Sequence, residues 1–532
     1  MKSEDSLTTA VAAEICRALE GGNTSFQVAS WIETTESGEE LLRMYGDTQC
    51  RPLWINEEGI DHQALYMIHA VKHSADDGLD IYDPAYNLES ILSLMGEIES
   101  DTAPDNKLEI LAQLDILLSD AYMMVGKHLY NGVLPRDRAS LKWAITVKKP
   151  LDFPRRLREA LLKNTLLESL DQLAPSSYPY QALKRILEKY HQIEEHGGWK
   201  TIEPLYPKGY PVEEIKERLR AEGDLSMDEN SVEEYHNALI HFQKRHGIKA
   251  DGIVGIKTLS KLNIPVEEKI ETVRLNMERW RWMPQNIDSS HIAVNLPDFS
   301  LSLIYDGTAV MNMSAIIGKE ERPTPIFNAN MTNIVVNPYW RVPNTILQED
   351  VIPSMGKDIR YLKKNKIRIF KYTDQKGKEE INPASIDWEN VSAETFPYFL
   401  RQDSGWKNVL GHLKFMFPNP YDIYIHDTPE KYLFEKDHRA FSSGCIRIEE
   451  PDLLAEYLLA TNDSAVSDEQ NITEVIESGK TQKIPLLKPM RVYINYWTVW
   501  EDEEGTVQFR DDIYGYDREL AEALGWYNGI RY

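Results

Sequence analysis

Three residues that could carry out nucleophilic or acid–base chemistry lie within the stretch from Tyr424 to Pro451: His426, His438 and Cys445. A thiol attacks carbonyl groups only as the thiolate, and a neighbouring imidazolium can lower its pKa well below the free value of roughly 8.5. The same imidazole can afterwards protonate a leaving amine. Cys445 is therefore a candidate nucleophile, with a buried filler or a metal ligand as the alternatives.

The alternation of residue types places His426 and Cys445 on strand ends. In "DIYIHD" the isoleucines share one face and Tyr424 shares the other with His426; in "SSGCIRIEE" Cys445 and Arg447 lie opposite the isoleucines. Nineteen residues separate the histidine from the cysteine, which allows two adjacent strands with a loop between them. Cys445 follows Gly444, at a junction where backbone amides can converge on an oxyanion.

The rival interpretations of these residues remain open at this point. His438 lies in the charged loop "EKDHRAF", which favours a solvated histidine over a catalytic base. No C-x-x-C or H-x-x-x-H spacing occurs near Cys445, so a zinc site is disfavoured. A free cysteine is most often a small buried hydrophobe, and the residues alone do not exclude that role.

The hydrophobic periodicity predicts a multi-domain α+β protein. Residues 10–205 have helical spacing and end in a linker rich in glycine and proline, and residues 208–266 read as a small three-helix module. From 267 to 532 the period changes to that of strands, as in "HIAVNLPDFSLSLIYDG". Residues 343–410 interrupt these strands and have the size of a lid or capping insertion.

Composition bounds the class of protein. The chain has 532 residues and a net charge of −26, which argues against a nucleic-acid partner. Its 3 cysteines give no readable disulfide framework, although a Cys16–Cys50 pair stays open. No apolar run is long enough to span a bilayer, and the amino terminus lacks a basic and an apolar targeting segment. The protein is therefore cytoplasmic, or its targeting segment has been removed, and composition does not distinguish these two alternatives.

Several motifs together resemble the L,D-transpeptidases, the cysteine enzymes that cross-link bacterial peptidoglycan, in their long, multi-domain periplasmic branch. "IHDTP…LF…RAFSSGCIRI" is similar to the active-site signature, with support from "RLNMERWRWMP", "NPYWRVPNTIL" and "LGHLKFMFPNPYDIYIHDTP". "RPLWIN" and "LDILLSDAYMMVGKHLYNGVLP" resemble a helical scaffold domain, and "FQKRHGIKADGIVGIKTLSKLN" resembles a peptidoglycan-binding domain. The resemblance covers nearly the whole chain.

The resemblance implies roles for individual residues. Cys445 is the implied nucleophile and His426 the general base, oriented by a backbone carbonyl rather than by Asp427 as a triad acid. Gly444 and Cys445 would supply oxyanion-hole amides, and Ser443, where many relatives have histidine, would contribute its backbone N–H. The remaining implied substrate-groove residues are Ser442, Arg447, Trp340 and Tyr424. Arg447 could equally brace the loop, and the two aromatic residues could equally pack in a core.

The implied function is L,D-transpeptidation without a metal or organic cofactor. Tetrapeptide stems would acylate the cysteine, release D-alanine and form 3→3 cross-links; water as acceptor would give an L,D-carboxypeptidase instead. The implied partners are peptidoglycan stem peptides and glycan, carbapenem inhibitors and other cell-wall synthesis proteins, in the periplasm or cell envelope. A non-catalytic peptidoglycan-binding scaffold is the alternative of another class, and a spacer is the alternative role of the small module. A cysteine peptidase acting on proteins is disfavoured because the upstream cysteine-containing motif of such enzymes is missing.

Overall fold

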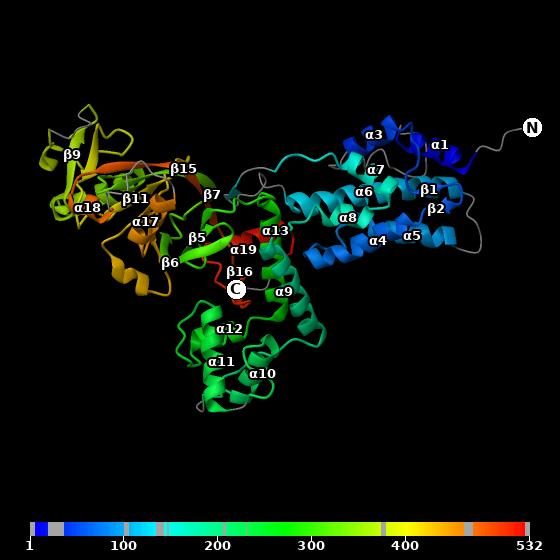
Figure 1. The fold of residues 1–532 in the computed structure, drawn as a ribbon, viewed down its shortest axis with the longest axis horizontal. Helices are drawn as coiled ribbons and strands as arrows, with labels where there is room; N and C mark the ends of the chain where they lie inside the picture. The colour runs from blue at the N-terminus through cyan, green and yellow to red at the C-terminus, as the bar shows by residue number, and fades with distance from the viewer. Residues whose placement is uncertain are drawn as a thin grey trace, which may run out of the picture.

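The computed structural model describes residues 6–19, 37–99, 106–134, 143–145, 148–205, 209–229, 231–373, 379–461 and 472–526. The chain is elongated (Figure 1), with a helical region at one end, a sheet-rich region at the other, and a small helical module projecting from the middle. The predicted mixed α+β architecture is confirmed. No helix among the described residues combines the length and the apolar character that a membrane span requires.

The helical region packs around one long helix, α6 (Lys107–Asn131), whose residues are buried on nearly all sides. A helix that is apolar all round must be covered by neighbours, and within the described part of this region the other helices cover it. These are α1 (Leu7–Leu19), α3 (Gly38–Asp47), α4 (Gln63–His73), α5 (Leu88–Glu99), α7 (Phe153–Lys163) and α8 (Leu166–Asp171). The short elements β1 (Ile55–Asn56), β2 (Gly59–Ile60), η1 (Ser74–Asp77) and η2 (Pro84–Tyr86) connect them.

A disulfide joins Cys16 of α1 to Cys50, just beyond α3. The sequence left this pair open because the two cysteines are 34 residues apart and only the packing of α1 and α3 against α6 brings them together. The bond ties the amino-terminal helix to the helical region.

Two long helices connect the three regions. α9 (Tyr178–Glu195) packs along α13 (Val266–Trp282), and α13 has Glu267 and Glu268 in its first turn and Arg279 and Arg281 in its last, as the helix dipole favours. Between them lies the small module of α10 (Val212–Glu222), α11 (Val232–Arg245) and α12 (Ile256–Leu262). A Ser231/Glu234 capping box starts α11.

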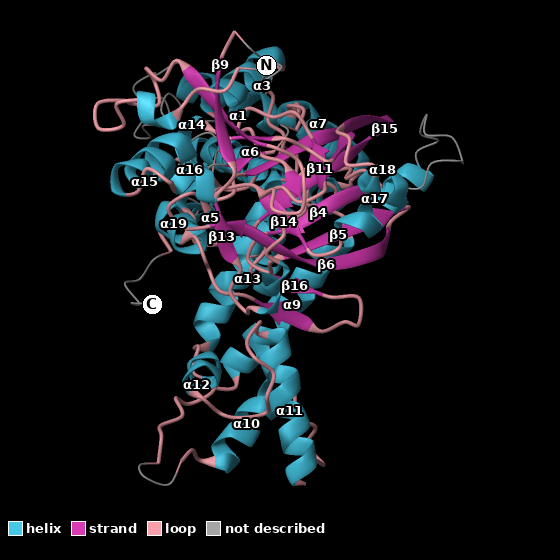
Figure 2. Cartoon of the chain, turned by 90° about the vertical axis from the view of Figure 1, so that its left-hand side faces the viewer, coloured by secondary structure: helices cyan, strands magenta, loops and turns pink. Residues whose placement is uncertain are grey.

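The sheet-rich region is one closed sheet. Its strand order is β11-β12-β14-β6-β5-β4-β15-β7, and β11 also pairs with β7, which closes the ring. The strands are β4 (His291–Asn295), β5 (Ser300–Tyr305), β6 (Thr308–Gly318), β7 (Ile326–Val336), β11 (Leu413–Met416), β12 (Ile425–His426), β14 (Ile446–Ile448) and β15 (Gln482–Asn495). Burial alternates along β4 as the sequence predicted. The sheet and the helices that cover it are seen in Figure 2.

Further elements flank the closed sheet. β13 (Ala440–Ser442) pairs with β6 beside the loop that carries Cys445, and η5 (Lys431–Glu435) precedes it. The carboxyl-terminal elements are α17 (Pro451–Thr461), α18 (Ile472–Glu477), the hairpin β16 (Val499–Glu501) and β17 (Val507–Phe509), and α19 (Tyr516–Ala523).

One strand of the sheet comes from the helical region. β3 (Trp143–Ala144) pairs in parallel with Ile326 and Phe327 at the start of β7. The Trp143 ring contacts Trp282 and Trp497 edge-on, with ring centroids 5.4 and 6.0 Å away. The stretch predicted as mostly helical therefore contributes one segment to the sheet, because a two-residue strand is too short to produce a readable alternation.

The insertion is a subdomain with its own core. Its three-stranded sheet has the order β8-β10-β9, from β8 (Trp340–Arg341), β9 (Ile367–Lys371) and β10 (Tyr398–Gln402). Helical segments α14 (Asn344–Ile346), η3 (Leu347–Val351), α15 (Ile352–Lys357), α16 (Tyr361–Lys364) and η4 (Pro383–Ser385) complete it. Residues such as Leu362 and Ile369 are fully buried there, so the insertion is a folded body rather than a loose loop.

Candidate active site

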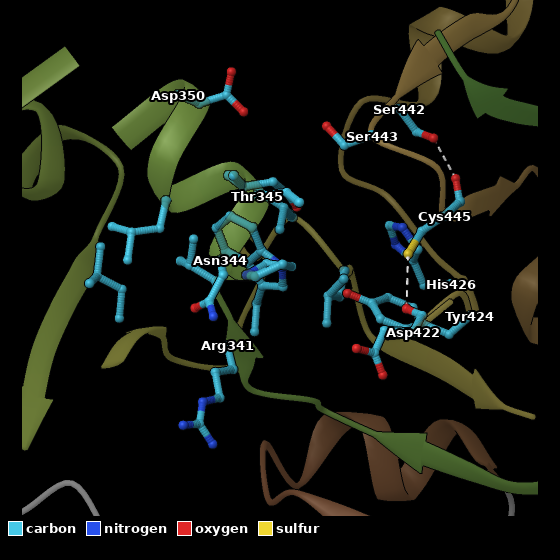
Figure 3. A pocket seen from close by; sticks show the side chains of 18 of the residues that line it. Arg341, Asn344, Thr345, Asp350, Asp422, Tyr424, His426, Ser442, Ser443 and Cys445 are labelled. Atoms are coloured by element: carbon cyan, nitrogen blue, oxygen red, sulfur yellow. Dashed lines mark hydrogen bonds between the residues drawn. The ribbon is translucent and has the colours of Figure 1, made fainter. Parts of the chain in front are cut away.

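Cys445 and His426 are brought together by a pair of parallel strands. β12 ends at His426 and β14 begins at Ile446, and in their register Ile425 lies opposite Ile446 and His426 opposite Arg447. This register places Cys445 beside Tyr424, whose carbonyl accepts a hydrogen bond from the Ile446 amide at 3.1 Å. The side chains of Cys445 and His426 both line the pocket drawn in Figure 3.

A backbone carbonyl orients the imidazole of His426. Nδ1 donates to the Asp427 carbonyl oxygen at 2.5 Å, which leaves Nε2 as the unprotonated ring nitrogen. His426 is buried, and burial together with the positive charge of Arg447 lowers its pKa to about 3. The imidazole is therefore neutral in the resting protein.

The Asp427 carboxylate binds backbone amides and a lysine, and it does not hydrogen-bond to the imidazole of His426 as a triad acid would. Its oxygens accept hydrogen bonds from the His412 amide at 2.8 Å and the Thr428 amide at 2.7 Å, and Lys431 lies 3.1 Å away. The side chain fills the space where Gly411 lacks a Cβ, and Gly411 has a φ of +58°. Asp427 thus fixes the two chain segments that flank β12 instead of polarising His426.

The thiol of Cys445 is neutral as well. Burial raises its pKa, opposed in part by hydrogen bonds with Tyr424 and by the charges of Lys414 and Arg447. Our expectation of an imidazolium that lowers the thiol pKa is wrong for the resting protein, because burial disfavours both charged forms. The pair can become charged only by transferring a proton as the thiol attacks.

The loop that carries Cys445 is shaped by Gly444. Its φ is +111°, and a Cβ there would meet the Ile423 side chain at 3.1 Å. The Gly444 amide donates to the Ser442 hydroxyl at 3.1 Å, and that hydroxyl donates to the Cys445 carbonyl at 2.5 Å. The Gly444 amide is therefore already engaged. Across the described residues, no backbone hydrogen bond uses the amides of Ser443 or Cys445, so both remain available as donors.

The predicted substrate-groove residues fall into two groups. Arg447 Nη1 donates to Glu430 at 2.7 Å. This ion pair favours a role in bracing the loop over a role in binding a carboxylate of the substrate. Trp340 is nearly buried in the core of the insertion and also lines the cavity. Tyr424 lines the cavity and interacts with Cys445 and Trp340.

A cavity of about 1240 Å³ opens in front of the thiol. The closed sheet supplies one wall, including Cys445 and His426, and the insertion supplies the facing wall, including Asn344 and Thr345. A cavity of this size accommodates a peptide-sized ligand.

Sequence reasoning missed two cations near the thiol. Lys414 pairs across β11 and β12 with His426, and its ammonium lies 3.6 Å from the centroid of the Tyr424 ring. The alternation in "LKFMF" could have placed it on the site face. Arg322 donates to Ser443 at 2.9 Å and to Asp350 at 2.6 Å, and no local pattern reveals these long-range contacts.

The alternatives to this site are weak. His438 is exposed, packs against Phe299 at a centroid distance of 5.4 Å, and does not line the cavity. Within the described ranges, no three His, Cys, Asp or Glu side chains gather as a metal ion would need.

Comparison with known proteins matches each region of the chain. The model of the L,D-transpeptidase catalytic domain (YkuD) matches residues 289–476, a scaffold-domain model matches 39–187, and the "Putative peptidoglycan binding domain" model matches 208–262. A Haemophilus influenzae protein described as "Putative L,D-transpeptidase" is 36% identical over 257 residues, covering 48% of this chain. The chain spans 50% of the length of that relative.

A solved structure described as the Ldtfm–avibactam carbamoyl enzyme is similar over 44% of this chain and 64% of its own, at 10% identity and a TM-score of 0.18. A likeness at that level does not constrain function. The three domain matches follow the order of the three regions of the fold. The chain is therefore a multi-domain protein that carries an L,D-transpeptidase catalytic domain behind a scaffold domain and a peptidoglycan-binding-type domain.

Proposed function

We propose that the protein is an L,D-transpeptidase that forms 3→3 peptidoglycan cross-links through an acyl-enzyme on Cys445. The observation that carries this proposal is the thiol held beside a buried, neutral imidazole at the wall of a peptide-sized cavity. A binding protein has no need of that pair. The catalytic unit would be residues 267–532 with the 343–410 insertion as a lid, carried by a scaffold at 10–205 and a module at 208–266.

In the first half-reaction, Cys445 Sγ attacks the carbonyl of the third residue of a tetrapeptide stem. His426 Nε2 takes the thiol proton as the S–C bond forms, and the Ser443 and Cys445 amides face the developing oxyanion. The C–N bond to the terminal D-alanine then breaks, and His426 returns the proton to the departing amine. A neutral starting pair suits this route, because His426 begins free to accept a proton.

In the second half-reaction, the side-chain amine of a neighbouring stem attacks the thioester. His426 removes the amine proton, the C–S bond breaks, and the thiol is regenerated with the new amide bond. Water in place of the amine gives a tripeptide, which is the L,D-carboxypeptidase alternative. The insertion wall of the cavity would favour the amine by limiting access of water to the thioester.

Location and inhibitor sensitivity belong to the same proposal. Peptidoglycan lies outside the cytoplasmic membrane, and the Cys16–Cys50 disulfide is a bond typical of oxidising compartments, which supports a periplasmic or cell-envelope site. The small module would bind glycan. Carbapenems would acylate Cys445, because a strained lactam carbonyl can take the place of the stem carbonyl.

The test is mass spectrometry of products from purified disaccharide-tetrapeptides, with the wild type beside Cys445→Ala. A cross-linked dimer that has lost one D-alanine, absent in the variant, is the expected result. Tripeptide alone would assign the carboxypeptidase activity. Unchanged substrate with a folded wild type would contradict the proposal and favour the non-catalytic scaffold.

A further inference from the structure

The cavity at Cys445 is one end of a longer track. A second cavity of about 280 Å³ shares the side chains of Trp340, Ile346, Tyr361 and Val409 with it. This middle cavity in turn shares Lys366, Ile367, Gln402, Trp406 and Lys407 with a third, of about 700 Å³, on the insertion. The three cavities therefore lie in a row from the thiol to Trp406, each adjoining the next through shared lining side chains, and we call this row the track.

The far end of the track combines an aromatic surface with positive charge. Trp406 is 68% exposed, and the ammonium groups of Lys407 and Lys366 lie 4.6 and 5.7 Å from its ring centroid. The outer cavity is also lined by Arg360, Lys363 and Arg368, against the acidic residues Glu380 and Asp403. This cationic surface is unexpected on a chain with a net charge of −26. It favours ligands that carry carboxylates.

The loop that presents Trp406 is held in place from beneath. Gln402 is buried; its Nε2 donates to the Asn365 and Lys407 carbonyls at 3.0 and 3.1 Å, and its Oε1 accepts from the Val409 amide at 3.0 Å. Asn408, also buried, donates to the Asp403 and Pro338 carbonyls, both at 3.0 Å. These bonds pre-organise the exposed ring, which lowers the entropy lost on binding.

We infer that this track binds the acceptor strand of peptidoglycan, with a carboxylate-bearing sugar-peptide seated on Trp406 and its lysines. The inference rests on the proposed function and names the place of its second substrate. A sugar ring presents a face of C–H groups to an indole, and lysine ammonium groups bind the carboxylates of the stem. The middle cavity, which Pro429 also lines, would lead the acceptor amine toward the thioester on Cys445.

Binding is tested first without turnover, in the Cys445→Ala protein. The probe is purified disaccharide-tripeptide, which can accept but has no terminal D-alanine to release, measured by calorimetry at low and high salt. Trp406→Ala or Lys366→Glu in this background is expected to weaken binding about tenfold, as loss of an interface aromatic or charge commonly does. Tyr82→Ala, 71% exposed on the helical region, and Lys371→Glu on β9 are the matched controls and should bind as the parent does.

The chemistry of the ligand is tested with two further probes. A neutral chito-oligosaccharide lacks the carboxylates and the free tripeptide lacks the sugars, and both are expected to bind at least several-fold more weakly. Equal binding of either would overturn the inferred ligand class. If all variants bind the disaccharide-tripeptide as tightly as the parent protein does, the track is not its binding site. If the parent protein shows no binding up to millimolar concentration, the track is overturned as well.

Turnover then separates this inference from the proposed function. In the Cys445 background, Trp406→Ala should raise the acceptor concentration needed for half-maximal cross-linking about tenfold and shift products toward tripeptide. An unchanged dimer-to-tripeptide ratio would contradict the inference. If the wild type binds the probe at Trp406 yet forms no cross-link, the proposed function fails while the track stands.

Discussion

The chemistry of the site depends on burial acting on two groups at once. The surroundings that lower the pKa of His426 to about 3 also raise the pKa of Cys445, so neither carries a charge before substrate arrives. A neutral thiol resists adventitious alkylation and oxidation, which matters in an oxidising compartment. The thiol and the imidazole therefore stay neutral until a substrate carbonyl occupies the cavity, and charges are separated only as the thiol attacks.

Alkylation by iodoacetamide tests the neutral pair. The rate at Cys445 should keep rising with pH past the pKa of an ordinary thiol, with no plateau between pH 4 and 8, because the raised pKa keeps the thiol mostly protonated there. His426→Ala should leave this profile nearly unchanged while lowering turnover by roughly 10²- to 10⁴-fold, as loss of a general base does. A fast, pH-independent plateau that vanishes in His426→Ala would instead show an ion pair.

Lys414 is one of the two cations whose charge favours the thiolate of Cys445. Its ammonium lies over the Tyr424 ring, and its charge opposes the raised pKa of Cys445. Lys414→Met should therefore move the alkylation profile to still higher pH and slow acylation at neutral pH, whereas Lys414→Arg should largely restore both. Identical profiles for Lys414→Met and wild type would assign Lys414 to packing alone.

At the scale of elements, Arg322 connects the insertion to the nucleophile loop. From the turn between β6 and β7 it reaches Glu349 and Asp350 on η3 and Ser443 beside the thiol. Each of these bonds is close to solvent and contributes little to global stability. Their joint geometry, however, fixes one wall of the cavity against the other.

Arg322→Met should loosen the insertion without unfolding the protein. We expect faster amide hydrogen exchange in 344–364, a fall in unfolding free energy of about 1 kcal/mol or less, and more tripeptide relative to dimer. Lys431→Met removes another cation near the site, one that contacts Asp427 rather than the insertion, and serves as the control. Unaltered exchange in 344–364 would show that the insertion holds its position by its own core.

The elements that the sequence predicted correctly are those whose pattern is local. The alternation of β4 and of "DIYIHD" needs only neighbouring residues, and it located both His426 and the strand that bears it. The pairing of β11 with β7, the contacts of Arg322 and the engaged amide of Gly444 depend on segments far apart or on loop geometry. No periodicity reports these contacts. Burial was likewise invisible in the motif, and it reversed the expected charge state of the catalytic pair.

At the scale of the whole molecule, the catalytic region is joined to the rest by buried structure rather than by flexible linkers. α13 runs from the module to the sheet, and Arg281 donates to the Asp77 carbonyl of the helical region at 2.6 Å. Arg510 donates to the Arg245 carbonyl of the module at 3.0 Å. A change in the stability of one region should therefore alter the stability of the other two.

Removing the disulfide tests how far that dependence extends. Cys16→Ser with Cys50→Ser should lower the stability of the helical region by about 4 kcal/mol, the effect expected for losing a cross-link over a loop of this length. Tripeptide and dimer formation should persist at 25 °C because Cys445 lies in the other region. Calorimetry should show an earlier first transition; a single unshifted transition would mean that α1 adds nothing to the fold.

The two residues of β3 have a consequence for how the protein can be divided. They occupy the open backbone edge of β7 at Ile326 and Phe327, and the Trp143 ring covers Trp282 and Trp497. A fragment that begins at α13 would lose this cover and present a bare strand edge beside exposed indoles, which is a template for edge-to-edge pairing between copies. Dividing the chain at its family boundaries would thus yield a catalytic fragment prone to aggregate, and a short peptide bearing the Trp143 segment, added in trans, should keep it monomeric.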